Sequence, residues 1–391
     1  MAAPHQPMAL ARRPLTAALV AAALALPASA RAQTGDAPEV ALVTMGPGDD
    51  LFSRFGHAAL CVRDAISPQG RCYNYGTAEF ASFGALLWDV LRGRARFWVS
   101  VVDEPQMMAQ YARVEDRTVW RQVLPYPPAA RRRLVARLAL DALPEHRSYV
   151  YHHYRDNCST RLRDHLDAVS EGSLSTARAQ PTGRTWRART LEGLAADARV
   201  LALAELLLGR TLDAPMNRWE EMFLPAVLRE EVQRASGAAP AVVSTRARPL
   251  PEAGEPDRGV GVLAAVGAAL AALGFVAGQG RSRPLARGAR ALLVAALTLL
   301  GALVWGMAAA STLPELRSSA LLLVLTPTDL ALGWSSTWAR YGRARLVGLV
   351  LVLAAWAVGS LAQAAVGVMA MATLLAIGAF AQPEETLPPS W

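Results

Sequence analysis

A cysteine and a histidine, about a hundred residues apart, have surroundings that suit nucleophilic chemistry. Cys158 follows Asp156-Asn157, a pair typical of the start of a helix. Unpaired backbone N–H groups and the helix dipole stabilise a thiolate at such a position. His57 lies in a short apolar stretch that predicts a strand. An imidazole beside this thiol would complete a cysteine nucleophile, provided that the two side chains meet.

The strand pattern around His57 suggests a third member for this site. A β-hairpin is expected over 55–77, and alternate side chains put His57 and Cys61 on one face. If Cys61 lies opposite Cys72, then Asn74 is a diagonal neighbour of His57. Asn74 could then orient the imidazole and fix its tautomer.

The helix that begins at Cys158 should carry the thiol toward the protein body. Leu162, Leu166 and Val169 follow at helical spacing, so Cys158 heads the apolar stripe. A free cysteine usually packs in the core as a small hydrophobic residue, and this is the alternative interpretation of Cys158. The helix start and an exported location favour the nucleophile.

Three other histidines compete as the base. His165 is seven residues along the same helix, roughly 10 Å from Cys158, which is too far for proton transfer. His152 and His153 precede the helix and stay open as candidates, although an aromatic strand flanking the site also explains them. A metal site of His57, His153 and Cys158 has no supporting ligand spacing, so neither a metal nor a cofactor is expected.

The chain contains three cysteines, all in the part expected to be exported. An odd number in an oxidising compartment indicates one disulfide and one free thiol. Cys61 and Cys72, on neighbouring strands, are the expected disulfide, which leaves Cys158 free.

The first 32 residues predict an export signal. Arg12 and Arg13 precede an apolar run that ends near Leu26, and small residues follow it. The run is too short to cross a bilayer comfortably, which favours a cleaved signal over an anchor.

The C-terminal part predicts a transmembrane domain over 258–382, with a tail over 383–391. Four or five spans are expected from apolar stretches of nearly the length that crosses a bilayer, at 259–278, 291–310, 318–334, 346–361 and 362–381. Two of the loops are rich in arginine and are therefore expected to be cytoplasmic: Arg281, Arg283, Arg287 and Arg290 in the first, and Arg340, Arg343 and Arg345 in the second. The N-terminal domain then faces outward. Asp329 would lie at membrane depth, either as a functional acid or as a buried acid in a broken helix.

The formal net charge of +8 does not require a nucleic-acid partner. The sequence contains no lysine, and the arginines of the signal and of the two loops exceed the whole excess. Membrane topology and composition explain the charge, so nucleic-acid binding is not expected.

Between the signal and the spans, the pattern predicts one α+β domain over 33–235, in which an antiparallel sheet packs on helices. A stretch rich in Ala, Pro and Gly over 236–257 is expected to be a linker without a folded element. The fold class is thus an α+β domain followed by an all-α transmembrane bundle.

Several of these motifs together resemble the Lnb N-terminal periplasmic domain family. The resemblance rests on Phe55-Gly56-His57-Ala58-Ala59-Leu60, Tyr73-Asn74-Tyr75-Gly76-Thr77, Asp156-Asn157-Cys158-Ser159-Thr160-Arg161 with Arg163-Asp164, and Pro215 with Trp219-Glu220-Glu221-Met222-Phe223-Leu224-Pro225. It covers about 40–230, and the membrane part is similar to a segment found in some members. The order of histidine before cysteine is similar to circularly permuted papain-like proteins of the NlpC and lecithin-retinol acyltransferase types. That resemblance implies His57 as base, Asn74 as orienting residue and Cys158 as nucleophile. The third residue is often histidine in the acyltransferase-like relatives, so Asn74 departs from their pattern.

The sequence therefore predicts an inner-membrane, multi-pass protein with a papain-like periplasmic domain. We expect a thiol hydrolase or acyltransferase acting on an amide, ester or thioester of the envelope, with the membrane as partner. The substrate would be a peptidoglycan peptide, a lipoprotein or a lipid. The alternative is a non-catalytic envelope binding or assembly module that keeps the fold.

Overall fold

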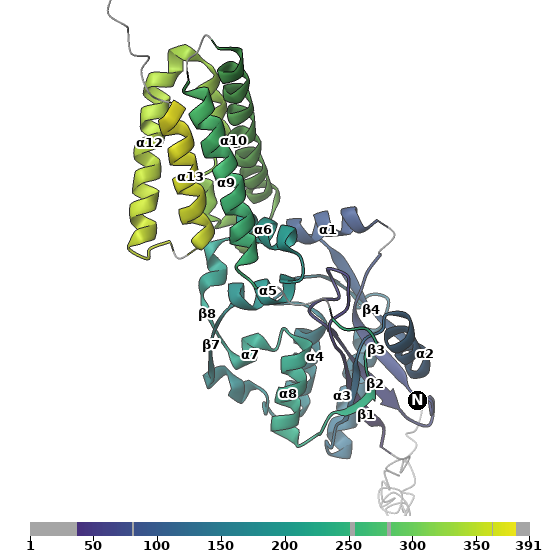
Figure 1. The fold of residues 1–391 in the computed structure, drawn as a ribbon. Helices are drawn as coiled ribbons and strands as arrows, with labels where there is room; N and C mark the ends of the chain where they lie inside the picture. Colours follow the sequence, from purple (N-terminus) through teal and green to yellow (C-terminus); the bar gives the residue numbers. More distant parts are fainter. Residues whose placement is uncertain (1–36, 80–81, 251–254, 280–282, 362, 381–391) are drawn as a thin grey trace, which may run out of the picture. The chain divides into compact units, whose positions relative to one another are not determined.

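The computed structural model describes residues 37–79, 82–250, 255–279, 283–361 and 363–380, and no side chains over 335–339. The expected signal peptide, Arg281 of the first arginine-rich loop and the C-terminal tail lie outside the described residues. Figure 1 shows the order of the elements along the chain.

A seven-stranded antiparallel sheet forms the centre of the N-terminal domain, in the order β6-β4-β3-β2-β1-β5-β9. Its strands are β1 (Glu39–Met45), β2 (His57–Arg63), β3 (Arg71–Thr77), β4 (Arg96–Asp103), β5 (Val119–Val123), β6 (Ser148–Val150) and β9 (Ala241–Ser244). A separate ribbon pairs β7 (Pro181–Thr185) with β8 (Pro215–Asn217). The antiparallel sheet packed on helices agrees with the expected α+β class.

Helices cover both faces of this sheet. One face packs on α3 (Pro128–Asp141), α4 (Cys158–Val169) and α8 (Pro225–Ser236), and the other on α2 (Glu104–Ala109) with the π-helical turn η1 (Gln110–Val114). The remaining helices of the domain are α1 (Phe83–Arg92), α5 (Trp186–Leu194), α6 (Ala198–Leu207) and α7 (Arg218–Glu221), with 3₁₀ turns η2 (Ser175–Ala179) and η3 (Arg210–Asp213). Alternate residues of β2 belong to the two cores: Leu60 faces α4, and Cys61 faces α2.

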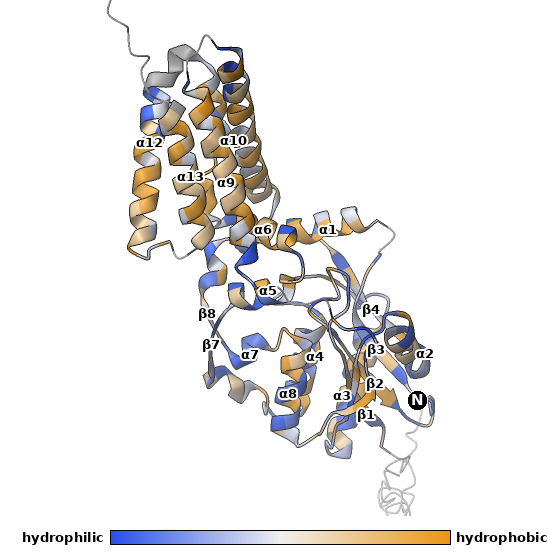
Figure 2. Cartoon of the chain, in the orientation of Figure 1, coloured by the Kyte–Doolittle hydropathy of each residue, from blue (hydrophilic) through white to orange (hydrophobic). Residues whose placement is uncertain are grey.

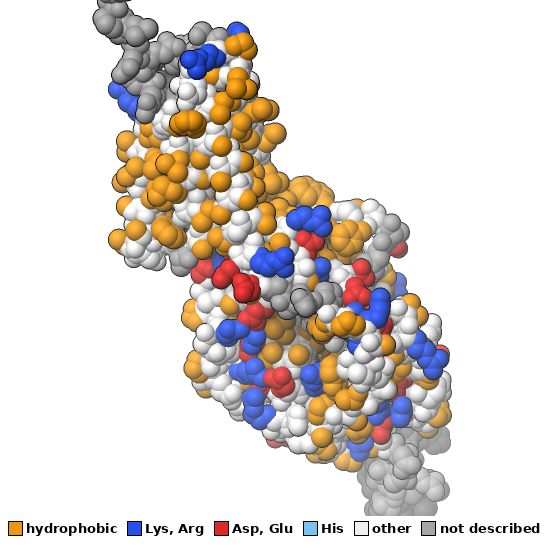
Figure 3. All heavy atoms as spheres, in the orientation of Figure 1, with side chains coloured by type: hydrophobic (Ala, Val, Ile, Leu, Met, Phe, Trp, Pro, Cys, Tyr) orange, Lys and Arg blue, Asp and Glu red, His pale blue; other side chains and the backbone are white. Residues whose placement is uncertain are grey.

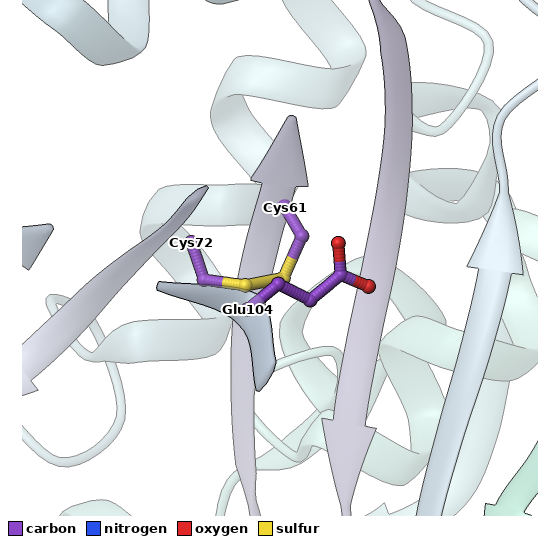
Figure 4. A group of neighbouring side chains, drawn as sticks. All are labelled: Cys61, Cys72 and Glu104. Atoms are coloured by element: carbon purple, nitrogen blue, oxygen red, sulfur yellow. A yellow bond between two sulfur atoms is a disulfide. The ribbon is translucent and has the colours of Figure 1, made fainter. Parts of the chain in front are cut away.

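The β2–β3 register is the one that the alternation argument assumed. Cys61 lies opposite Cys72, and Ala59 lies opposite Asn74. Cys61 and Cys72 form a disulfide (Figure 4), and Cys158 is a free thiol.

Helix α4 begins at Cys158 because Asn157 caps it. The Asn157 side chain accepts the Thr160 N–H at 2.9 Å, and the Thr160 hydroxyl accepts the Asn157 N–H at 2.9 Å. This reciprocal pair is a capping box, here with threonine at the third helical position. Leu162 and Leu166 are fully buried, as the apolar stripe predicts.

The expected linker is partly folded, which corrects the prediction for 236–257. Residues Ala241–Ser244 form β9 on the free edge of β5. Two carboxylates hold the chain that follows: Asp116 accepts the N–H groups of Ala247 and Arg248, and Asp49 pairs with Arg246 at 2.6 Å. The composition is typical of a flexible linker, but Val242 and Val243 have high β-propensity and allow this segment to pair with the free edge of β5.

The C-terminal region is helical. It contains α9 (Arg258–Ala277), α10 (Pro284–Ala310), α12 (Ser335–Ala357) and α13 (Ala364–Phe380), whose surfaces are mostly apolar (Figures 2 and 3). Of these, α9 and α10 are long and apolar enough to cross a membrane, and α13 contains a shorter apolar helix. Helix α12 starts before the expected span and includes Arg340, Arg343 and Arg345, which the sequence had placed in a loop.

The third expected span is not an α-helix. Residues 314–333 form the short helix α11 (Pro314–Arg317) and the 3₁₀ segments η4 (Ala320–Leu323) and η5 (Pro327–Gly333), which run beside α10. Side chains satisfy carbonyl groups that the broken helix frees: Trp305 donates to Leu322 and Leu325, and Arg345 to Val324.

Asp329 is fully buried in this broken segment. Its carboxylate accepts Arg345 Nε at 2.7 Å, Arg345 Nη2 at 2.9 Å and the Tyr341 hydroxyl at 2.8 Å. Both of its oxygens are therefore used by the protein. Of the two hypotheses for Asp329, these contacts favour the buried acid of a broken helix.

Candidate active site

His57 and Cys158 approach each other from opposite faces of the sheet. His57 starts β2 and its side chain is on the face covered by α2, whereas Cys158 starts α4 on the other face. The ends of both elements meet beside Gly76 of β3, where the register between β3 and β4 shifts. This edge position lets two side chains from different layers share one space.

Gly76 keeps that space open. A methyl group on Gly76 would lie 3.7 Å from Cβ of Cys158, 3.7 Å from Cε1 of His57 and 4.0 Å from the hydroxyl oxygen of Tyr149. Cβ of Cys158 and Cε1 of His57 are thus at most about twice 3.7 Å apart. Gly76 also has φ +99°, a conformation that side chains rarely adopt. The alternation that places Asn74 near His57 also places Gly76 on that face, but it gives no reason to assign Gly76 a role.

Asn74 holds the imidazole. His57 Nε2 lies 3.2 Å from Asn74 Oδ1, and the Asn74 amide donates to Met107 Sδ at 3.4 Å. With the oxygen facing the ring, Nε2 carries the proton and Nδ1 keeps its lone pair. The Tyr111 ring stacks on His57 with 5.5 Å between centroids, which limits rotation of the imidazole.

The imidazole is neutral at neutral pH. Burial, and to a smaller extent the positive charge of Arg117, lower the pKa of His57 to about 4, and the Asn74 hydrogen bond only partly opposes these two effects. A neutral imidazole is the form that can accept a proton.

The thiol is also held in its neutral form. Burial raises the pKa of Cys158, and this outweighs hydrogen bonds from the backbone N–H groups of Ala58 and Ser159 and the charge of Arg117. The helix N-terminus does stabilise the thiolate, as the sequence suggested, but desolvation is the larger effect. The resting pair is therefore a thiol and an imidazole rather than a preformed ion pair.

Arg117 is a buried cation beside this pair, with only 2% of its surface exposed. Its Nε donates to the Gly46 carbonyl at 2.8 Å, and Nη1 donates to Glu115 at 3.1 Å. The guanidinium also stacks over Tyr111, 5.2 Å from the ring centroid. Its Nη2 is buried without a hydrogen-bond partner. The sequence offered no pattern that distinguishes Arg117 from the other arginines.

A cavity of about 680 Å³ joins these groups. His57, Asn74, Arg117 and Cys158 all line it. Much of the remaining wall is apolar or aromatic: Phe52, Phe55, Phe83, Phe97, Val102, Met107, Tyr151, Phe223 and Pro225. We call it the thiol cavity. Its size and lining are typical of a pocket for an organic ligand.

The competing histidines take different positions. His153 lines the thiol cavity, its Nδ1 lies 3.2 Å from the Tyr151 hydroxyl, and its Nε2 is buried without a partner. His152 instead lies 3.7 Å from Glu315. His165 contacts Tyr75 at 2.9 Å and Asp141 at 3.0 Å, in the core between α3 and α4. His153 is thus the alternative that remains beside Cys158.

The metal alternative gains no support from the described residues. The group of His, Cys and carboxylate side chains that lie close enough to share an ion consists of Cys61, Cys72 and Glu104 (Figure 4). Two of its sulfurs are joined in the disulfide, and Glu104 pairs with Arg63 at 2.9 Å and Arg121 at 2.8 Å. No free ligand set remains in that group.

Tyr149 is a further polar group that the sequence analysis did not assign. Its hydroxyl is buried without a hydrogen-bond partner and lies beside the space above Gly76. The Arg161 guanidinium packs 3.8 Å over its ring and fixes the side chain. The aromatic run before Cys158 pointed to this strand, but not to one hydroxyl.

Comparison with known proteins gives one match. Residues 28–191 match the family model described as the Lnb N-terminal periplasmic domain, and His57, Asn74 and Cys158 lie inside the match. The Trp219–Pro225 motif lies outside it. No curated protein and no solved structure shows significant similarity to the chain. With the two apolar helices α9 and α10, the match indicates an envelope-associated membrane protein with a periplasmic N-terminal domain.

Proposed function

We propose that this protein is a membrane-anchored, periplasmic thiol hydrolase or acyltransferase. In this proposal Cys158 is the nucleophile, His57 the general base and Asn74 the orienting residue, as in circularly permuted papain-like enzymes. The observation that carries it is the vacant space at Gly76, which Cys158 and His57 both border inside the thiol cavity. The order of a histidine on a strand and a cysteine at a helix start supports the papain-like comparison.

The first step is proton transfer from the Cys158 thiol to His57 Nδ1. A neutral thiol and a neutral imidazole are suited to this transfer, which coincides with attack on the substrate carbonyl. The Asn74 carbonyl oxygen accepts from Nε2–H and stabilises the imidazolium that forms. The positive charge of Arg117 favours the developing thiolate and disfavours the imidazolium.

The new C–S bond gives a tetrahedral intermediate, and its collapse breaks the bond to the leaving group. His57 returns its proton to that group, which leaves an acyl-thioester on Cys158. Water or another nucleophile then gives its proton to His57, attacks the thioester and regenerates the thiol. The Cys158 N–H at the start of α4 and the free Tyr149 hydroxyl are the candidate donors to the oxyanion.

The C-terminal helices are proposed to cross the inner membrane several times. Contacts of Ser311 with Leu91 and of Gln363 with Leu208 join one end of these helices to the N-terminal domain. The other ends of α9 and α13 meet at Gly278 and Ala379. The arginine-rich starts of α10 and α12 are the ends opposite those that lead to Ser311 and Gln363, and this supports the positive-inside orientation.

The substrate is proposed to be an acyl-bearing envelope molecule: a peptidoglycan peptide, a lipoprotein or a lipid. The aromatic lining of the thiol cavity favours a substrate with an apolar portion. The chemistry of the site applies equally to an amide, an ester or a thioester.

Intact-protein mass spectrometry tests this proposal. The full-length protein is incubated with envelope membranes and quenched in acid, and adducts on Cys158 are mapped. We expect an acyl adduct on wild type and none on Cys158→Ser. His57→Gln should form it about 10²-fold to 10⁴-fold more slowly. The exposed His146→Gln variant is the matched control and should behave as wild type.

A non-catalytic binding or assembly module predicts a different result. Wild type would then form no adduct, and the envelope of a Cys158→Ser strain would have the same composition as that of the wild type. Equal adduct rates in wild type and His57→Gln would rule out the proposed base and leave His153 as the candidate.

A further inference from the structure

A second cavity, of about 390 Å³, lies on the other side of the segment that leads into β2. Phe55 and Gly56 line both this cavity and the thiol cavity, so the two share a wall. Three arginines line the second cavity: Arg54, Arg189 and Arg229. We call it the arginine cavity.

Arg54 forms no salt bridge among the described residues. Its Nη1 is buried and has no hydrogen-bond partner. A guanidinium without a partner is costly in a protein interior, because its hydration is lost and not replaced. Arg54 therefore lines the cavity and has an unused hydrogen-bond donor.

Arg229 is a second guanidinium without a carboxylate partner in the described part of the chain. It stacks 3.9 Å over the Trp120 ring, and its Nη1 has a weak contact of 3.4 Å with the Thr44 hydroxyl. Burial lowers the pKa of Arg229 below its ordinary value, and the negative charge of the neighbouring Glu230 only partly opposes this effect.

The third arginine is neutralised. Arg189 donates to Glu221 at 2.5 Å and to Glu192 at 2.9 Å. Glu192 is the carboxylate that lines the arginine cavity, and it also pairs with Arg184. Arg54 and Arg229 are thus the two arginines of this cavity that form no salt bridge among the described residues.

Guanidinium groups bind carboxylates and phosphates through two parallel N–H bonds, and the charge of two such groups matches the roughly −1.5 to −2 charge of a phosphate group at pH 7. The cavity is too large for a single ion: at about 30 Å³ for each water, it corresponds to roughly a dozen water molecules. The rest of its wall includes Trp120, Leu224 and Leu250, which would cover an organic group.

We propose that the arginine cavity binds an organic phosphate, with the phosphate on Arg54 and Arg229 and the organic part against Trp120 and Leu224. The site is separate from the thiol and does not depend on the acyl chemistry proposed above. Phe55 and Gly56, which form the wall shared with the thiol cavity, directly precede His57 in the sequence.

Ligand-dependent thermal unfolding of the full-length protein in detergent tests this site. The probes are sn-glycerol 3-phosphate, inorganic phosphate and short-chain phosphatidylglycerol, each compared with NaCl of equal ionic strength. We expect a saturable rise in the melting temperature of the wild type with at least one organic phosphate. Arg54→Gln and Arg229→Gln should each weaken its Kd at least tenfold. The exposed Arg113→Gln, which removes the same charge elsewhere, should change it less than twofold.

The probes also identify the source of the phosphate. Tighter binding of phosphatidylglycerol than of glycerol phosphate indicates a lipid headgroup, and the reverse indicates a soluble metabolite. Arg54→Lys keeps the charge but loses the bidentate guanidinium, so we expect a Kd between those of the wild type and Arg54→Gln. This variant also serves as a second test if Arg54→Gln does not fold. The proposal is overturned if no phosphate acts beyond NaCl, or if Arg54→Gln and Arg229→Gln respond as wild type.

Discussion

Arg117 in the thiol cavity and Arg345 in the C-terminal helices are both buried guanidinium groups, but their partners differ. Arg345 donates hydrogen bonds to both oxygens of Asp329 and to the Val324 carbonyl. Arg117 makes two such contacts and keeps a buried Nη2 without a partner.

The same difference extends to neighbouring groups. The hydroxyl of Tyr149 and Nε2 of His153, near Cys158, are also buried without partners, whereas the Tyr341 hydroxyl donates to Asp329 at 2.8 Å. A satisfied network fixes architecture, and unused donors beside a nucleophile are available for a ligand. The comparison supports an architectural role for Asp329, and it leaves the unpaired groups of the thiol cavity available for the proposed chemistry.

The largest expected effect is the loss of chemistry in Cys158→Ser. Acylation by a p-nitrophenyl ester should fall by at least about 10³-fold, because the chain has no other free thiol in the described residues. The free energy of unfolding should change by less than about 1 kcal/mol, since serine is nearly isosteric. Burst kinetics and urea unfolding measure the two quantities. A large loss of stability would show that Cys158 is mainly a core residue.

Asp329→Ala should lower the free energy of unfolding strongly and leave the acylation rate unchanged. Removing one partner of a buried ion pair costs about 3–5 kcal/mol, because the other charge is left buried and alone. The acylation rate of the folded fraction should stay unchanged. Arg199→Ala, which breaks an exposed pair with Asp197, is the control and should cost under about 1 kcal/mol. Normal stability in Asp329→Ala would contradict an architectural role.

The next largest effect is a loss of folding stability in acid, caused by the buried histidines of the thiol cavity. Burial lowers the pKa of both His57 and His153 from 6.5 to about 4, so the unfolded chain binds more protons between these values. Stability is complete above pH 6.5 and is lost as the pH falls through about 4. Each histidine can contribute up to roughly 3 kcal/mol, and less where it borders the cavity.

Urea unfolding at pH 7 and pH 4.5 measures this loss. His57→Gln should lose less stability between the two pH values than wild type does. The exposed His146→Gln is the control and should follow wild type. A His57→Gln variant with the wild-type pH dependence would mean that His57 is not held neutral by burial.

The smallest expected effect concerns charge selectivity. Arg117 should make Cys158 react faster with the anionic reagent MTSES than with the cationic MTSET. Arg117→Gln should lower the ratio of these rates about tenfold, equivalent to roughly 1.4 kcal/mol. Arg117→Lys should keep most of the ratio, and the exposed Arg113→Gln should keep all of it. An unchanged ratio in Arg117→Gln would show that Arg117 does not act on approaching reagents.

Local patterns predicted much of the N-terminal domain. Alternation along 57–63 and 71–77, with the assumption that Cys61 lies opposite Cys72, led to the β2–β3 register, and the apolar stripe with Asn157 predicted helix α4. These features follow from neighbours in the sequence, through pleating, helical spacing and capping. The proximity of Asn74 to His57 followed from the register alone.

Other features depended on contacts that no local pattern contains. Arg117 is buried because Glu115, Gly46 and Tyr111 surround it, and an isolated arginine in the sequence carries no such information. The third apolar stretch has the length of a span, but Trp305 and Arg345 stabilise it as 3₁₀ segments instead. Tertiary partners overrode local propensity in both places.

Strand β9 limits how far the N-terminal domain can move from helix α9. Asp116 and Asp49 hold the chain as far as Arg248, and helix α9 begins at Arg258. Even when fully extended, the chain between Arg248 and Arg258 can span only about 35 Å, at roughly 3.5 Å per residue. If α9 crosses the bilayer and the proposed activity holds, the acyl donor and acceptor must both come within this distance of the lipid surface.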